Sequence, residues 1–461
     1  MSTAVKRPRR ASSLRTSLRA STYDGICNAV MVGFGESYFP AFALFLGASA
    51  FEAGVLATLP ILVGSLFQLA VPHITNRTGD RAWVIALVSV QALSLAPILW
   101  RGGDNTFAWL LGWACVYWVA GLGVNPAWNS WMGRMIPERL RRRYFSRRAV
   151  PVQVTLLVAL VLAGFTVDAA KRSSHGALVG FLGIFAVAMV ARLAGAYCQT
   201  WQSAPPTRAS LEPAHLVNVI RGLVVEPYGR LIRLVCLIYF AVFFSAAYFT
   251  PYMLNKLGMS YAEFTVLNGA VIVARIFASS YWGKVAGLFG NRRTLQVAGL
   301  LMVPLPALWL ISDHVGYLLV LQLIAGVVWA GFDLAVVLSF FDCTTNENRS
   351  RVLAVYNAAN GVAMIAGTLA GGVFFLHLGG AAYLYVFLGS SLLRLAAVTF
   401  FARGAGVRLP NEHTFQDVFV RVVTFRPGNG ESMRPIILRT TRNRRDSVAP
   451  AASDHPVKRD R

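Results

Sequence analysis

Long apolar runs separated by short polar segments dominate the sequence. A helix that crosses a bilayer needs roughly 20 largely apolar residues. Twelve segments fit this requirement: 21–46, 51–73, 82–101, 106–132, 148–168, 175–198, 233–257, 261–286, 293–312, 315–341, 352–376 and 380–402. Strands of a membrane barrel would be shorter and would alternate in polarity. The pattern therefore predicts an all-α polytopic membrane protein with twelve transmembrane helices.

Polar segments divide these helices into two bundles of six. The predicted parts are a basic N-tail (1–20), an N-terminal bundle (21–198), a linker (199–232), a C-terminal bundle (233–402) and a basic C-tail (403–461). The linker contains an amphipathic stretch at 215–225, which we expect to lie on the inner membrane surface. The C-tail is expected to be partly disordered, with a short surface element at 415–425.

The positions of the basic residues predict the orientation. Of the 43 Lys and Arg residues, 36 fall in the two tails and in the connections on the same side as the tails, whereas four fall on the other side. Cytoplasmic segments carry the excess of Lys and Arg. Both termini are therefore expected in the cytoplasm, with the protein in a bacterial-type inner (plasma) membrane. We expect the first helix to remain in the protein rather than to be cleaved as a signal peptide, because no short apolar region with a small-residue cleavage site follows the basic leader.

Composition agrees with a membrane protein and excludes other classes. Apolar residues make up 56% of the chain and charged residues only 14%, against roughly a quarter in soluble domains. The net charge of +23 lies in clusters between apolar runs, which indicates topology and attraction of the basic tails to anionic lipids rather than nucleic-acid binding. The five cysteines form no Cys-x-x-Cys pair, so no metal site or cofactor is predicted. We expect a monomer.

An internal repeat relates the two bundles. Residues 36–82 match residues 247–293 without a gap, and ten of the 47 positions are identical. The matches include Pro40 with Pro251 and Glu52 with Glu263, each 211 residues apart. Because the offset spans six helices, both copies should have the same orientation. This is the parallel two-half arrangement of many secondary transporters.

Two loops resemble a motif of the major facilitator superfamily. The segment from Gly283 to Arg293 contains Gly290, Arg292 and Arg293 in a spacing similar to the superfamily's Gly-x-Leu-x-Asp-Arg-x-Gly-Arg-Arg loop. The loop after the second helix, with Gly79 and Arg81, resembles a degenerate copy. The motif's acidic position is Asn76 in one copy and Gly287 in the other. The resemblance implies a carrier for a small-molecule substrate. Gly would permit a tight turn, and Arg would anchor the loop.

Three ionisable residues are predicted far from helix ends. They are Glu36, Arg275 and Asp333, in the first, eighth and tenth helices. Such groups are costly in a membrane unless they are paired or hydrated, so they mark site candidates. The resemblance implies that helices 1, 4, 7 and 10 line a central cavity. Glu36 or Asp333 would then exchange a proton with the solution during transport. The alternative is a fixed Arg275–Asp333 pair that locks helix packing.

Further polar and aromatic residues are candidates for solute binding. Asn125 and Asn129 lie one helical turn apart, and Asn125 overlays Asp333 at an offset of 208. Tyr38, Tyr248 and Tyr252 are candidates for substrate contact. Arg192 and Arg394 are expected to snorkel from the ends of their helices to the membrane interface.

Other functions have less support from the sequence. No His-Glu-x-x-His, Gly-x-Ser-x-Gly or phosphate-binding loop occurs, so we expect no enzyme. The fifth helix lacks the Gly-Pro-x-x-Gly-Gly pattern that resembles drug/proton antiporters, although a drug efflux pump stays an alternative. A non-transporting receptor or assembly factor on the same fold is the alternative in another class.

Overall fold

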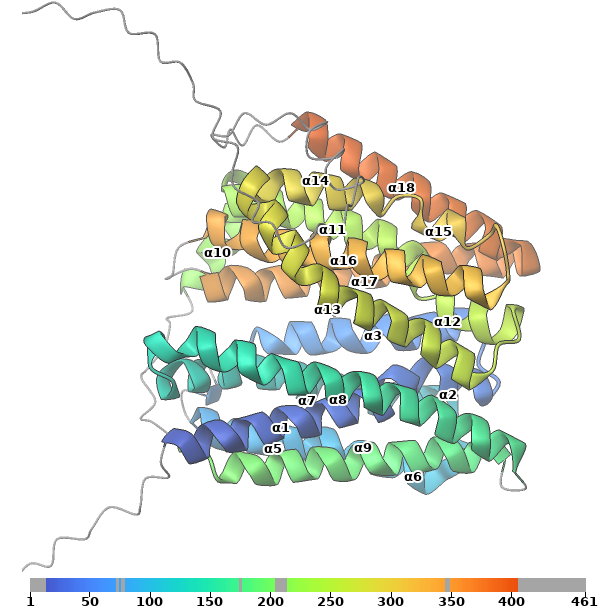
Figure 1. Cartoon of the computed structure of the whole chain (residues 1–461), viewed down its shortest axis with the longest axis horizontal. Helices are drawn as coiled ribbons and strands as arrows, with labels where there is room; N and C mark the ends of the chain where they lie inside the picture. Colours follow the sequence, from blue (N-terminus) through green and yellow to red (C-terminus); the bar gives the residue numbers. More distant parts are fainter. Residues whose placement is uncertain are drawn as a thin grey trace, which may run out of the picture. The chain divides into compact units, whose positions relative to one another are not determined.

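The structure, a computed structural model, describes residues 14–71, 74–75, 79–173, 176–203, 214–344 and 349–404. These residues lie within one compact unit, residues 1–419. The described residues form helices and their connections (Figure 1). The predicted surface element at 415–425 and the loop residue Asn76 lie outside the described residues.

The N-terminal half contains six spans, of which the first and third are interrupted. The first is built from α1 (Leu14–Phe34), η1 (Glu36–Tyr38) and α2 (Phe39–Phe45). The third is built from α5 (Asp80–Leu93) and α6 (Ala96–Arg101), followed by η2 (Gly102–Asp104). The other spans are single helices: α3 (Ala50–Gln68), α7 (Phe107–Met135), α8 (Glu138–Arg172) and α9 (Gly176–Thr200).

The C-terminal half repeats this order after a linker helix, α10 (Ala214–Val225), which covers the predicted amphipathic stretch. Its first span joins α11 (Pro227–Ala246), α12 (Phe249–Pro251) and a π-helical turn, η3 (Tyr252–Lys256). Its third joins α14 (Asn291–Leu301) and α15 (Leu305–Leu308). The single-helix spans are α13 (Tyr261–Phe289), α16 (Val315–Cys343), α17 (Arg349–Leu378) and α18 (Ala382–Gly404), with η4 (Gly379–Ala381) before the last.

The twelve predicted spans are all present as helices, but several begin earlier than predicted, and α1, α8 and α11 do so by six residues or more. Helix α1 begins at Leu14 rather than at residue 21, and α8 begins at Glu138 rather than at residue 148. In both places the extension contains several Arg residues and at least one Leu, which are favourable helix formers. Hydropathy marks only the apolar part of a helix, so it misses basic turns that continue beyond the apolar run.

Ten helices in the described chain are long and apolar enough to cross a membrane by themselves. The first and ninth spans are the exceptions. Helix α1 carries Arg15, Arg19 and Asp24, which lower its apolar character. In the ninth span, α14 ends at Leu301, and Pro304 precedes the short α15. Proline cannot continue the backbone hydrogen bonds of a helix, which accounts for the break.

The internal repeat is visible in the atomic detail of the helix starts. Ser49 and Ser260, 211 residues apart, each cap a helix, and Glu52 and Glu263 complete the two capping boxes. In each box the serine hydroxyl accepts from the backbone N–H of the glutamate at 3.2 Å. The glycines of the preceding turns also correspond, because Gly47 and Gly258 have φ of 89° and 63°. The two halves therefore share their local structure as well as their helix order.

The two halves contact each other mainly along two helix pairs, α3 with α17 and α8 with α13, and also where α2 meets α12. We define the termini end of the bundle as the end where α1 begins and α18 ends, and the far end as the opposite one (Figure 1). Toward the far end, the Tyr38 hydroxyl lies 2.6 Å from Oγ1 of Thr265 and donates to the Leu160 carbonyl at 2.9 Å. Gly164 of α8 lies beside this contact, where a side chain would meet Thr265.

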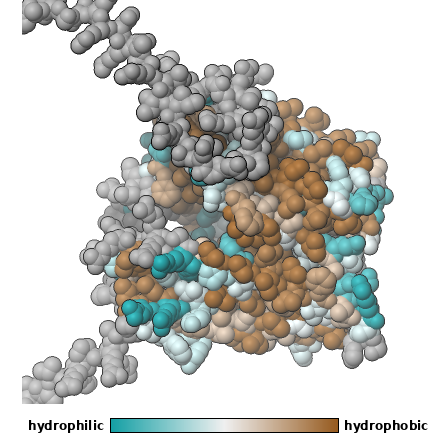
Figure 2. Space-filling model, viewed as in Figure 1, coloured by the Kyte–Doolittle hydropathy of each residue, from teal (hydrophilic) through white to brown (hydrophobic). Residues whose placement is uncertain are grey.

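Apolar side chains face outward over much of the bundle. Figure 2 shows one face largely covered by hydrophobic residues. Many large apolar side chains are exposed, including Phe277 at 77%, Leu392 at 67% and Val190 at 62%. A soluble protein rarely exposes apolar surface of this extent. The exposed face therefore fits the hydrocarbon core of a bilayer.

Candidate functional site

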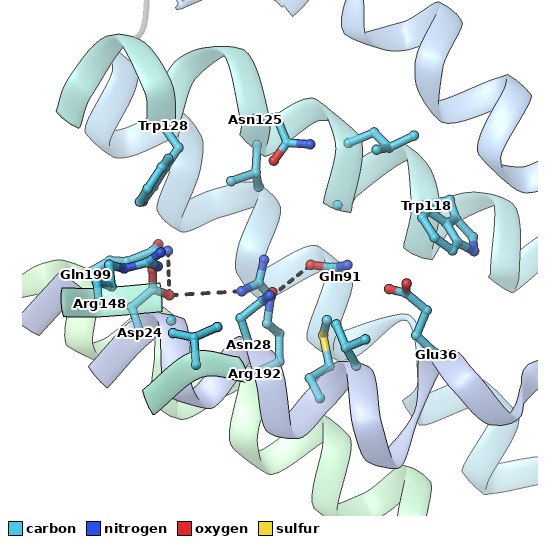
Figure 3. Close-up of a pocket in the computed structure, with 17 residues that line it drawn as sticks. Asp24, Asn28, Glu36, Gln91, Trp118, Asn125, Trp128, Arg148, Arg192 and Gln199 are labelled. Atoms are coloured by element: carbon cyan, nitrogen blue, oxygen red, sulfur yellow. Dashed lines mark hydrogen bonds and ion pairs between the residues drawn. The ribbon is translucent and has the colours of Figure 1, made fainter. Parts of the chain in front are cut away.

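A cavity of about 310 Å³ lies inside the N-terminal half. Residues from α1, α5, α7, α8 and α9 line it, together with Glu36 of η1 (Figure 3). Its volume is at the lower end of the roughly 300–1,000 Å³ of small-molecule sites. The cavity is formed by membrane-spanning helices, but it carries an unusual number of charged and amide side chains.

A buried hydrogen-bond network crosses the cavity between α1, α5 and α9. The Arg192 guanidinium donates from Nε to Oε1 of Gln91 at 2.8 Å, and its Nη1 lies 4.0 Å from Oδ1 of Asp24. Gln199 donates to the same Asp24 oxygen at 3.0 Å. Asp24, Arg192, Gln91 and Gln199 are each exposed by no more than 5%. The pairing compensates the loss of hydration that each of these groups suffers.

Two further charged residues lie at opposite ends of this network. Glu36 accepts a hydrogen bond from the Tyr117 hydroxyl at 3.1 Å, and Figure 3 shows its carboxyl group near Trp118. At the other end, Arg148 donates to the Ser21 carbonyl at 3.1 Å, and its guanidinium carbon lies 5.0 Å from the centre of the Trp128 ring. The cavity thus contains two carboxylates and two guanidiniums.

Small residues on the neighbouring helices make room for these side chains. A Cβ atom on Gly25 of α1 would lie 2.5 Å from Nη2 of Arg148. A Cβ on Gly121 of α7 would overlap the Gln91 amide, and one on Gly195 of α9 would lie 3.2 Å from the Asp24 carboxylate. Close approach at small residues is common between membrane helices. Here it lets long polar side chains extend across the bundle.

Two of the predicted site residues lie at this cavity. Glu36 and Asn125 both line it, on η1 and α7 respectively. Asn129 is exposed one turn further along α7 and does not contribute to the lining. Of the two neighbouring tryptophans, Trp128 lines the cavity, whereas Trp131 is buried and donates to the Ser203 carbonyl at 2.8 Å.

Arg275 and Asp333 lie in the C-terminal half, away from this cavity. The Arg275 guanidinium forms an ion pair with the Asp333 carboxylate and so joins α13 to α16. Their side chains are 43% and 34% exposed, so the pair is only partly buried. This is the pairing that the packing alternative predicts. Their part in transport stays a prediction.

The three predicted tyrosines are buried in helix packing and do not line the cavity. Tyr38, Tyr248 and Tyr252 are at most 5% exposed. The Tyr248 hydroxyl donates to the Thr368 carbonyl, and the Tyr252 hydroxyl to that of Trp309. Substrate contact at these residues stays a prediction, because their hydroxyl groups are engaged by backbone carbonyls in this arrangement of the helices.

Of the loop-motif residues, Gly79 and Gly290 lie in turns, whereas the others lie within helices, and the role of the motif in transport stays a prediction. Gly79 and Gly290, 211 residues apart, have φ of 81° and 85°, where glycine is favoured, and each precedes a helix. Arg81 donates to the Thr200 carbonyl and so ties α5 to α9. Gly283 lies inside α13, and Arg292 and Arg293 lie in the first turn of α14.

The ends of the third and fourth spans are joined in both halves. Asp80 pairs with Arg134 in the N-terminal half. In the C-terminal half Asn291 donates to the Asp342 carboxylate at 2.7 Å. Asn291 follows Asp80 by 211 residues, and Asp342 follows Arg134 by 208. Equivalent positions in the two halves are therefore joined by an ion pair in one half and by an amide–carboxylate hydrogen bond in the other.

The sequence interpretation missed Asp24, Arg148 and Arg192. Asp24 and Arg148 lie close to the predicted starts of their helices, but the helices begin earlier, which places both residues well inside the bundle. The snorkelling prediction was wrong for Arg192 and Arg394, because they are only 5% and 4% exposed. Arg192 turns into the cavity, and Arg394 donates to the Met302 carbonyl at 3.0 Å, at the end of α14.

The arrangement can bind a small polar solute between α1 and α7 and can hold a proton on a carboxylate. No group of three His, Cys, Asp or Glu in the described part of the chain could hold a metal ion. The cavity offers hydrogen bonds, charges and aromatic faces to whatever enters it.

A family profile and several solved structures match this chain. The sequence profile of the Major Facilitator Superfamily matches residues 25–260 and 231–441. None of the curated proteins matches the sequence.

Several solved structures share the fold. A D-xylose–proton symporter superposes with a TM-score of 0.65 at 17% identity, over 85% of this chain and 97% of that one. The nucleoside transporter NupG gives 0.64 at 11% identity, over 84% and 100%. A bacterial homologue of the human lysosomal transporter Spinster, inward-facing and unoccupied, gives 0.60 at 13% identity, over 84% and 94%.

Proposed function

Since the chain belongs to the major facilitator superfamily, we propose that it is a secondary active transporter that moves a small solute across a bacterial-type inner membrane by alternating access. The single observation that carries this proposal is the polar cavity lined by helices of a membrane-spanning bundle. Buried charge inside a membrane is costly and is retained where it serves transport. The similar structures named for xylose and nucleoside transport support a small solute as the cargo.

The helix contacts favour a state that is closed at the far end. Tyr38 contacts Thr265 there, and Phe181 packs against Tyr261 with ring centres 5.3 Å apart. Both contacts join the two halves. The positive-inside count assigns the far end to the outside of the cell. The solute would then enter or leave the cavity from the cytoplasm in this state.

Glu36 is the carboxylate to which we assign proton coupling. It lies ten residues before the turn at Leu46, about 15 Å along the helix axis, near the middle of the membrane. It faces the cavity and has Tyr117 as its hydrogen-bond partner. Burial favours the neutral carboxyl group, whereas contact with water or a cation favours the carboxylate. Opening and closing of the cavity would therefore bind and release a proton.

Transport in proteoliposomes tests both the transporter function and the assignment of proton coupling to Glu36. Counterflow, in which internal solute drives exchange of the same labelled solute without an energy source, should occur with the wild-type chain. Glu36→Gln should keep counterflow but lose accumulation driven by an imposed proton gradient. Asp104→Asn, an exposed change at the far end, is the matched control and should keep both.

Each outcome discriminates between functions. Full gradient-driven uptake by Glu36→Gln would contradict coupling at this residue. Absence of counterflow for any solute, in a protein that still binds one, would favour a receptor or assembly factor instead.

A further inference from the structure

The charges that line the cavity balance one another. Asp24 and Glu36 supply two carboxylates, and Arg148 and Arg192 supply two guanidiniums. Each of the four has a partner within the protein: a glutamine amide, a tyrosine hydroxyl, a backbone carbonyl or the opposite charge. A solute with a net charge would have to disrupt one of these pairs or remain buried without a counter-charge. Either arrangement is unfavourable, because it leaves a charge without a partner in a site of low dielectric constant.

Other groups in the cavity are not engaged in this way. The side chains of Asn28 on α1 and Asn125 on α7 line the cavity and have no hydrogen-bond partner in the described structure. Figure 3 shows them on opposite sides of the space, with the indole rings of Trp118 and Trp128 to either side of Asn125. A primary amide both donates and accepts hydrogen bonds. An indole presents a broad apolar face.

We propose that this cavity binds a neutral, hydroxylated ring solute of the sugar or nucleoside kind. The inference rests on the proposed transport function and specifies the substrate class of the same site. Hydroxyl groups of the ring would exchange hydrogen bonds with the Asn28 and Asn125 amides. The apolar C–H face of the ring would lie against an indole. The cavity, about 310 Å³ in volume, has room for a solute of this bulk.

An amino acid or another zwitterion fits less well. Its ammonium and carboxylate groups would both require free counter-charges. The Asp24 carboxylate is already held by Gln199 and lies 4.0 Å from Arg192, which also donates to Gln91. The free amides therefore favour uncharged hydroxyl groups over ammonium and carboxylate groups.

Counterflow with chemically defined probes tests the substrate class. The neutral probes are D-glucose, D-xylose and uridine, and the charged probes are L-alanine, succinate and choline. We expect exchange of at least one neutral probe and of no charged probe. Exchange of uridine but not of the two sugars would assign the solute to the nucleosides, and the reverse would assign it to the sugars. Exchange confined to charged probes overturns the substrate class but leaves the proposed function intact, whereas absence of exchange for every probe overturns the substrate class and counts against the function as well.

Amide variants connect the result to the residues. Asn28→Ala and Asn125→Ala should each raise the KM for the transported neutral probe at least tenfold, with little change in the melting temperature. Asn125→Gln, which keeps the amide, should restore part of the loss. Gln153→Ala, an exposed amide on α8 outside the cavity lining, is the matched control and should keep the wild-type KM. An unchanged KM in both alanine variants would refute the assignment.

Discussion

The contact between α8 and α13 at Gly164 offers a direct test of the closed far end. A Cβ atom at Gly164 would lie 2.6 Å from Cβ of Thr265 and 2.9 Å from the Tyr38 hydroxyl oxygen. Carbon atoms pack best at about 3.5–4.0 Å, so the two helices would have to separate by about 1 Å. Tyr38 and Thr265 are fully buried and cannot turn away into solvent.

We therefore expect Gly164→Ala to destabilise this arrangement relative to one with the far end open. Overpacking of a buried contact costs about 1–3 kcal/mol. Each 1.4 kcal/mol changes an equilibrium tenfold. The population ratio of far-end-closed to far-end-open molecules should accordingly fall by about 5- to 150-fold, provided that the mutation does not affect the open state.

The distance between spin labels on the two halves can measure this shift. Trp100 in the N-terminal half and Ile311 in the C-terminal half are 82% and 67% exposed near the far end, so labelled cysteines there should not disturb packing. The five native cysteines are first replaced, and transport by that background is verified. Gly164→Ala should add a population at longer distances.

Gly183→Ala on α9 is the matched control, because a Cβ at Gly183 meets nothing within 4 Å. Its distance distribution should equal that of the background. If Gly164→Ala also leaves the distribution unchanged, the close approach of α8 and α13 does not limit opening, and the reasoning fails.

Two further predictions concern the repeated architecture. Ser49→Ala and Ser260→Ala each remove a helix cap with the same geometry. Each should lower the free energy of unfolding by about 1 kcal/mol and the melting temperature by about 1–3 °C. A large difference between the two variants would contradict equivalent roles. A double-mutant cycle tests the ion pair with Arg275→Gln, Asp333→Asn and the double variant. We expect a coupling energy of about 0.2–1 kcal/mol, because the two side chains are 43% and 34% exposed. A coupling above about 3 kcal/mol in thermal unfolding would show instead that the pair behaves as a fully buried one.

The helices and the repeat could be predicted from the sequence because both depend on local pattern. Apolar runs of bilayer length leave the backbone no alternative to a helix. The matched Ser and Glu residues of the two capping boxes were visible as identities at the 211-residue offset.

The site was predicted only in part, because its position depends on how far each helix extends. Glu36 and Asn125 were identified, since both lie deep within apolar segments. Asp24 was missed because the polar residues before it were assigned to the N-tail, which placed Asp24 near the start of the predicted helix. In the structure α1 begins at Leu14, so Asp24 lies well inside the helix. Arg192 was judged from its distance to a helix end, but its partner Gln91 lies on another helix, and hydropathy contains no information about such pairs.

The interrupted ninth span has a consequence for how the chain is assembled in the membrane. Helix α14 ends at Leu301, and the carbonyl of the following residue, Met302, accepts a hydrogen bond from Arg394 of α18. During synthesis the ninth span therefore emerges from the ribosome well before the side chain that satisfies its broken end. Each of the two groups is unfavourable in lipid by itself, because the Met302 carbonyl lacks a hydrogen bond and Arg394 carries a charge. The last helix thus completes the insertion of an earlier one, and chains that terminate before residue 394 should retain an unstable ninth span.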